Sequence, residues 1–144
     1  IKKNNKKSPK KLYEPSDKEK FMNSRQIKYF KQRLLTWKND LIEESSNTLD
    51  HLKEESSNKP DNADRASIES ERSLELRTRD RERKLLSKIN KALKKIEDGT
   101  YGYCEETNQP ISIERLKARP IATLSLEAQE MHEKFEKVYK EKEY

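Results

Sequence analysis

Apolar residues recur at helical spacing along two long stretches of the chain. Within each stretch they follow one another at intervals of three and four residues, as helices that pack along a narrow seam require. The members of the two stripes are Ile27, Phe30, Leu34 and Trp37, followed by Leu86, Ile89, Leu93 and Ile96. The pattern therefore predicts two long amphipathic helices.

The ends of both helices are marked by local signals. Asn23 or Ser24 can cap the first helix, and Gly99 suits the position just after the second, which begins near residues 61–64. Pro60, which lies between the two stripes, is the residue expected to break the helical run. These signals place a turn close to Pro60.

Antiparallel pairing of the stripes leads to the same turn. When Ile27 faces Ile96, Leu34 faces Ile89, and the midpoint of the pairing falls beside Pro60. We therefore predict a mainly α fold with a long antiparallel coiled-coil hairpin over residues 21–99 and its tip near residues 60–64. The apolar seam thins toward that tip, so we expect the distal hairpin to be the least stable part.

A small head is predicted to follow the hairpin, over residues 100–144. Turn signals at Gly102 and Asn108 are followed by a third helix that begins near Ser125. This helix carries an apolar stripe, which we expect to pack on the base of the hairpin. The stripe consists of Ala128, Met131, Phe135 and Val138.

Composition agrees with an elongated structure, because 30% of the residues are hydrophobic and 42% are charged. The net charge is +6, and residues 1–11 contain six lysines and no acid, so the remainder is formally neutral. We therefore predict a basic, disordered tail over residues 1–20 and no sequence-specific DNA binding.

The chain is expected to be cytoplasmic and not bound to a membrane. No apolar stretch reaches membrane-spanning length, and residues 1–20 lack the apolar core of a signal peptide. The single cysteine, Cys104, excludes an intramolecular disulfide, and the two histidines, His51 and His132, lie far apart on different predicted helices. No catalytic constellation is recognisable, so we expect no enzymatic activity.

Two charged features have both a plain and a functional interpretation. Asp61 and Asp64 stabilise the start of any helix, and two carboxylates are too few for a dedicated metal site. A basic stripe along the second helix is either a solvated flank or a surface for an anionic partner. The stripe consists of Arg77, Arg81, Lys84, Lys88, Lys91 and Lys95.

Three segments, in order along the chain, carry a family resemblance. Residues 60–67 at the predicted tip read PDNADRAS, residues 74–105 read LELRTRDRERKLLSKINKALKKIEDGTYGYCE, and residues 115–124 read RLKARPIATL. Together they resemble the DksA family, whose tip carries the pattern D-x-x-D-R-A. The resemblance covers nearly everything after about Glu14.

The resemblance implies a zinc-finger head that bears a coiled-coil hairpin. In this family the hairpin enters the secondary channel of bacterial RNA polymerase and places its tip near the active centre. The factor modulates the stability of open promoter complexes, notably at ribosomal RNA promoters, together with the alarmone ppGpp of the stringent response. The matching residues are Asp61, Asp64 and Ala66 at the tip, Arg81 at the polymerase contact, and Leu85, Lys88 and Arg119 at the ppGpp site.

The chain departs from the family pattern at the zinc site. The family has two CxxC pairs separated by 17 residues, and the aligned positions here are Cys104, Thr107, Ser125 and Ala128. With one thiolate we expect no zinc cofactor, a degenerate zinc-finger-like head held by packing, and similarity to the cysteine-poor members of the family. Gln129 replaces a lysine of the ppGpp pocket, which weakens the expected alarmone contact. We expect a monomer whose partners are bacterial RNA polymerase and ppGpp.

Two other functions are compatible with a hairpin. A Gre-type transcript cleavage factor uses an acidic tip in the same channel, but it carries a β-rich C-terminal domain, and here about 45 residues follow the hairpin. A coiled-coil adaptor or nucleic-acid-binding protein is the other alternative. The absence of aromatic residues between Lys38 and Thr100 argues against stacking on single-stranded nucleic acid.

Overall fold

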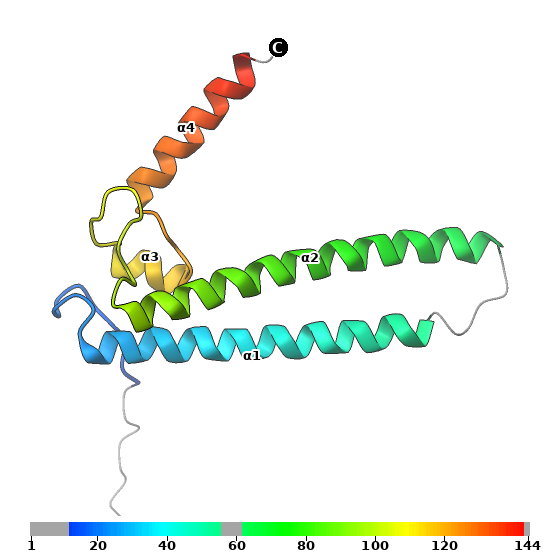
Figure 1. The fold of residues 1–144 in the computed structure, drawn as a ribbon, viewed down its shortest axis with the longest axis horizontal. Helices are drawn as coiled ribbons and strands as arrows, with labels where there is room; N and C mark the ends of the chain where they lie inside the picture. Colours follow the sequence, from blue (N-terminus) through cyan, green and yellow to red (C-terminus); the bar gives the residue numbers. More distant parts are fainter. Residues whose placement is uncertain (1–11, 56–61, 143–144) are drawn as a thin grey trace, which may run out of the picture.

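The structure, a computed structural model, describes residues 12–55 and 62–142. Two long helices, α1 (Ser24–Glu55) and α2 (Asn62–Asp98), run side by side in opposite directions (Figure 1). The predicted mainly α fold with a long antiparallel hairpin is thereby confirmed. Among the described helices, none is both long and apolar enough to cross a membrane.

Both helix ends at the base of the hairpin follow the predicted signals. The side chain of Asn23 accepts the backbone N–H of Gln26 at 2.9 Å, which satisfies one of the N–H groups that the first turn leaves unpaired. At the other end, Gly99 has a φ of 76°, and the N–H of Thr100 donates to the carbonyl of Lys95 at 2.9 Å. Local cap chemistry thus fixes where the hairpin meets the head.

The hydrophobic core lies at the base of the hairpin. Phe30, Leu34 and Ile89 are completely buried, whereas Leu76, nearer the tip, is 59% exposed. The base therefore holds most of the apolar contacts, and the distal part of the hairpin is held by fewer.

A hydrogen bond between the two long helices lies midway along the hairpin. The hydroxyl of Ser45 donates to the carboxylate of Glu82 at 2.6 Å. In the predicted register Ser45 lies opposite Thr78, one helical turn from Glu82. A glutamate side chain spans that offset because helical side chains lean toward the N-terminus of their helix. The detailed register stays a prediction.

The segment before α1 folds against the base of the hairpin. The buried amide of Gln26 donates to the carbonyl of Ser16 at 3.1 Å and accepts the N–H of Met22 at 2.8 Å. Residues 12–20, which the sequence assigns to a disordered tail, are therefore part of the folded base. Residues 1–11, with their six lysines, lie outside the described residues.

The head is built around the short helix α3 (Ile113–Ala118), which the sequence did not indicate as a separate element. The side chain of Ser112 caps it by accepting the N–H of Arg115 at 3.3 Å. Leu116 is completely buried and Ile111 almost so, so the head has an apolar centre of its own. This centre continues into the core at the base of the hairpin.

The last helix, α4 (Leu126–Lys142), projects away from the hairpin (Figure 1). The prediction that its apolar stripe packs on the hairpin base is wrong. Ala128 is buried, but Met131, Phe135 and Val138 are 57%, 56% and 48% exposed. The spacing correctly indicates an amphipathic helix, but it contains no information about the direction in which the helix leaves the head.

Candidate functional site

A cationic pocket of about 390 Å³ lies between α2 and the head. Lys88, Lys91 and Lys95 line it from the helix, and Arg115 and Arg119 line it from the head. The lysines share one face of α2 because they lie three and four residues apart, and the arginines are four residues apart. Five cations gathered in a cavity of this size suit a multiply charged anionic ligand.

Part of this positive charge is anchored by internal contacts. The Nε of Arg115 donates to the carbonyl of Leu124 at 2.8 Å, and the ammonium group of Lys95 pairs with the carboxylate of Glu105. These contacts engage Arg115 and Lys95 and leave the other cations of the lining to meet a ligand. The cationic residues with exposed side chains are Lys88, Lys91 and Arg119.

Tyr101 connects the pocket to the core of the hairpin. It lines the pocket, its ring centroid lies 5.7 Å from that of Phe30, and its hydroxyl donates to the carbonyl of Pro120 at 2.7 Å. Burial raises the pKa of Tyr101 well above its ordinary value, although the nearby Arg33 acts in the opposite direction. The phenol therefore stays a neutral donor that holds the head on the hairpin.

Most residues that the resemblance assigns to the ppGpp site meet in this pocket. Lys88, Arg119 and Gln129 all line it. Leu85 instead packs against the hydrophobic core and is not part of the lining. Arg115 is a lining residue that sequence reasoning missed, because the short helix α3 that carries it was not recognised from the sequence.

The four degenerate zinc positions also come together in the head. Cys104 is 1% exposed, and the N–H of Ala128 donates to the side chain of Ser125 at 3.3 Å. Burial acts to raise the pKa of Cys104. Hydrogen bonds from the Thr107 side chain and from the backbone of Ser125, Thr107 and Glu106 outweigh it and lower the pKa to about 6.

The side chains at these positions do not fit a structural zinc ion. Such a site needs four ligands, as a rule thiolates or imidazoles, and here Cys104 is accompanied by two hydroxyls and the methyl group of Ala128. Within residues 12–55 and 62–142 no cluster of three histidine, cysteine or acidic side chains is placed to hold a metal. Hydrogen bonds occupy the place that metal bonds would take.

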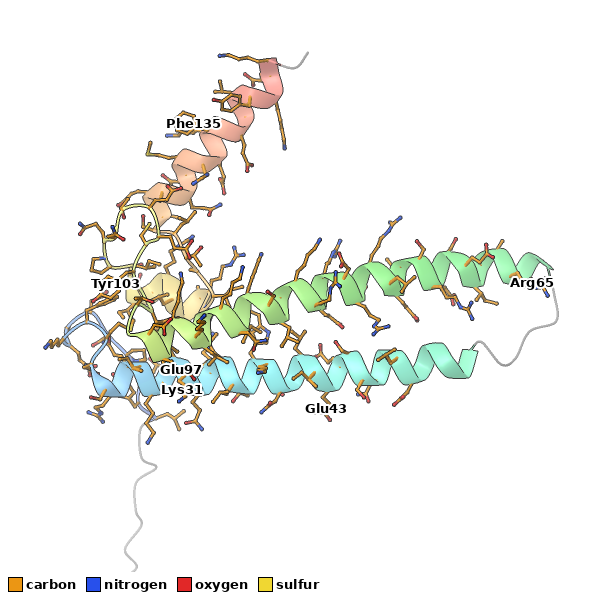
Figure 2. All side chains as sticks on the ribbon, in the orientation of Figure 1. Lys31, Glu43, Arg65, Glu97, Tyr103 and Phe135 are labelled. Atoms are coloured by element: carbon orange, nitrogen blue, oxygen red, sulfur yellow. The ribbon has the colours of Figure 1, made fainter. Side chains whose placement is uncertain are left out.

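Two of the three predicted tip residues, Asp64 and Ala66, lie at the far end of α2 from this pocket. Asp61 falls outside the described residues, Asp64 lies in the first turn of α2, and Ala66 is exposed two residues further on. Figure 2 shows Arg65 at the distal end of α2, a whole helix length from Tyr103 in the head. A ligand in the pocket and a partner at the tip would therefore be contacted by separate surfaces.

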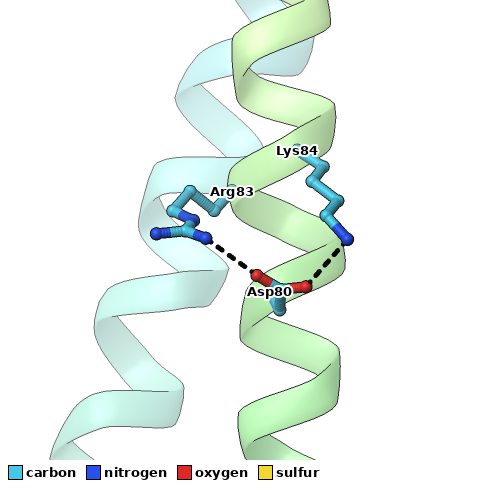
Figure 3. A network of polar contacts seen from close by, with 3 residues as sticks. All are labelled: Asp80, Arg83 and Lys84. Carbon is cyan, nitrogen blue, oxygen red and sulfur yellow. Dashed lines mark hydrogen bonds and ion pairs between the residues drawn. The ribbon is translucent and has the colours of Figure 1, made fainter.

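The middle of α2 carries a small ion-pair network (Figure 3). The carboxylate of Asp80 pairs with Arg83 and with Lys84, each at 3.0 Å. The hydrogen bond from Lys84, followed by the charges of both partners, holds the pKa of Asp80 below its ordinary value. Arg81 is exposed on the same helix and lines a shallow groove with Arg77.

Two family models match the chain. One, described as the N-terminal domain of the DnaK suppressor protein DksA, matches residues 26–96, which include most of α1 and α2. The other, described as the prokaryotic dksA/traR C4-type zinc finger, matches residues 99–134 in the head and α4. The boundary between the two matches therefore falls at the end of α2, at the base of the hairpin.

Several known proteins are similar over most of their length. The RNA polymerase-binding transcription factor DksA of Caulobacter vibrioides is 59% identical over 90% of this chain and 91% of its own. The protein of the same name from Escherichia coli strain K12 is 46% identical over 87% and 83%. The solved structure of transcription factor DksA2 from Pseudomonas aeruginosa has a TM-score of 0.76 and 39% identity, covering 81% of this chain and 90% of that one.

Proposed function

The chain belongs to the DksA family, and on that premise we propose that it binds bacterial RNA polymerase and regulates transcription in the cytoplasm. The observation that carries the proposal is the match of both family models, which fall on the hairpin and on the head. The relatives' printed names describe polymerase binding and no catalysis. This is a binding function, and we propose no enzymatic activity.

The hairpin is the part that would reach the polymerase active centre through the secondary channel. The 37 residues of α2 extend over roughly 55 Å at the rise of an α-helix. Asp61, Asp64 and Ala66 at its distal end would then contact the active centre and alter the stability of the open promoter complex. The long separation between tip and head supports this division of labour.

The cationic pocket is the site we propose for ppGpp, shared with polymerase. Lys88 and Arg119 would donate charge-assisted hydrogen bonds to phosphate oxygens, and Lys91 adds a third exposed cation. Gln129 contributes no charge, so we expect weaker alarmone binding than a lysine there would give. Leu85 would not contact ppGpp, but its packing against the hydrophobic core would hold α2, and with it Lys88, in position.

The degenerate zinc positions support a factor that folds without metal, and we propose that it acts as a monomer. The lone thiol of Cys104 leaves a zinc ion without enough ligands, and the hydrogen bonds around it join the turn after α2 to the start of α4. The head within the described residues contains no strand beyond an isolated bridge between Tyr103 and Pro110, which does not favour the Gre-type alternative.

Competition binding to the cognate polymerase tests the proposal with a matched pair of variants. Arg81→Ala should weaken binding about tenfold or more, the size expected for a lost hydrogen bond to a charged group. Arg83→Ala removes the same side chain two residues away, where it is already paired with Asp80. Wild-type affinity for Arg81→Ala, or an equal loss for both variants, would contradict the proposed contact.

A further inference from the structure

A second groove, of about 730 Å³, runs along the base of α1. It is separate from the cationic pocket, with which it shares no lining residue. Most of its wall comes from successive turns of one face of α1, and the segment before the helix closes one end. Its aromatic and cationic lining residues are Tyr13, Arg25, Lys28, Tyr29, Arg33 and Trp37.

The floor of this groove is apolar and held in a fixed arrangement. Tyr13 meets the ring of Tyr29 edge to face, with centroids 6.3 Å apart, and Tyr29 in turn meets Phe30 of the core at 5.2 Å. Trp37 is half-buried and packs against the same core. Because the rings are supported from below, a ligand could bury apolar surface on them without having to order them first.

The rim of the groove is mainly positive. Arg25, Lys28 and Arg33 are exposed along it, and Asp40 supplies the one acidic side chain of the lining. The guanidinium of Arg25 lies 4.7 Å from the centre of the Tyr13 ring, so a cation already stands over the apolar floor. The groove thus combines an aromatic floor with a cationic edge.

From this combination we propose that the groove is a docking site for an acidic protein segment that carries leucine or phenylalanine side chains. The apolar side chains would lie on Tyr29 and Trp37, and the carboxylates would meet the cationic rim. The lysine-rich residues 1–11 of this chain have the wrong charge for that rim.

Trp37 is the single tryptophan of the chain and provides the readout. Its fluorescence is followed while a short synthetic peptide of Asp, Glu, Leu and Phe is added to the full chain at low salt. We expect a saturable change that weakens as salt is raised. Two control peptides carry Lys in place of the acids, or Ala in place of Leu and Phe, and both should bind at least about fivefold more weakly.

Matched variants place the binding in the groove. Thr36→Glu puts a negative charge on its wall, whereas Asn39→Glu adds the same charge to an exposed site of α1 outside the lining. Thr36→Glu should weaken the peptide about fivefold or more, and Asn39→Glu should leave it nearly unchanged. Circular dichroism checks that both variants are folded.

Three results would overturn the proposal: no saturable change with the acidic peptide, equal binding of the lysine peptide, or saturable binding of oligothymidylate without binding of the peptide. The last would assign the groove to single-stranded nucleic acid instead. Since the assay contains no polymerase and Arg81 lies on α2, its outcome is independent of the proposed polymerase contact.

Discussion

Leu34 and Leu76 allow the same leucine-to-alanine change to be made at the base and in the distal part of one hairpin. Leu34 is completely buried among core residues, so Leu34→Ala removes its whole transfer free energy and leaves a cavity. The expected loss is about 3–4 kcal/mol of unfolding free energy. Leu76 is 59% exposed, so its truncation to alanine leaves no enclosed cavity. Leu76→Ala should therefore cost less than about 1 kcal/mol.

Urea unfolding followed by far-ultraviolet circular dichroism measures both losses on the full chain. Leu74→Ala, at a position 64% exposed, serves as a second distal variant and should behave like Leu76→Ala. The higher helix propensity of alanine reduces both distal costs further. Equal losses for Leu34→Ala and Leu76→Ala would refute the conclusion that the hydrophobic core is concentrated at the base.

Three further predictions concern the head and its pocket. The pKa of Cys104 is lowered to about 6 in the folded chain, so its thiolate stabilises the fold above the ordinary thiol pKa and loses that effect as pH falls through 6. The stability advantage of wild type over Cys104→Ser should thus shrink by about 2 kcal/mol between pH 8 and pH 6, and a constant difference in urea unfolding would contradict it. Lys88→Ala with Arg119→Ala should abolish the ppGpp-dependent increment in transcription assays while polymerase binding persists, whereas an unchanged ppGpp response would show that the pocket is not used. Phe135→Ala should cost less than about 1 kcal/mol in urea unfolding because this side chain is 56% exposed, and a loss of several kcal/mol would show that α4 packs on the rest of the chain.

The hairpin could be predicted from sequence because its signals are local or periodic. Asn23 and Gly99 mark helix ends through their own backbone chemistry, and the structure confirms both. The apolar stripes of α1 and α2 pack against each other, so no partner outside these two helices is required to bury them. The short helix α3 was missed because six residues are too few for a periodic pattern to be recognised.

Tertiary placement could not be predicted in the same way. The stripe on α4 has the spacing of a packed face, yet Met131 and Phe135 remain exposed because the helix projects away from the hairpin, a direction that spacing does not encode (Figure 1). Only some of the residues that line the cationic pocket could be predicted from the sequence. Lys88 and Arg119 came from the resemblance, but Arg115 lines the pocket through the placement of α3 in the head, which sequence spacing does not encode.

The central claim is that this chain binds polymerase and acts through the tip of its hairpin, and open-complex lifetime tests it most directly. The lifetime is measured at a ribosomal RNA promoter with the cognate polymerase, alone, with wild-type chain, and with Asp61→Asn and Asp64→Asn combined. Asparagine caps helices about as well as aspartate, so the double variant loses charge with little loss of fold. We expect wild type to shorten the lifetime and the double variant to bind polymerase without shortening it. A lifetime unchanged by saturating wild-type chain would contradict the claim.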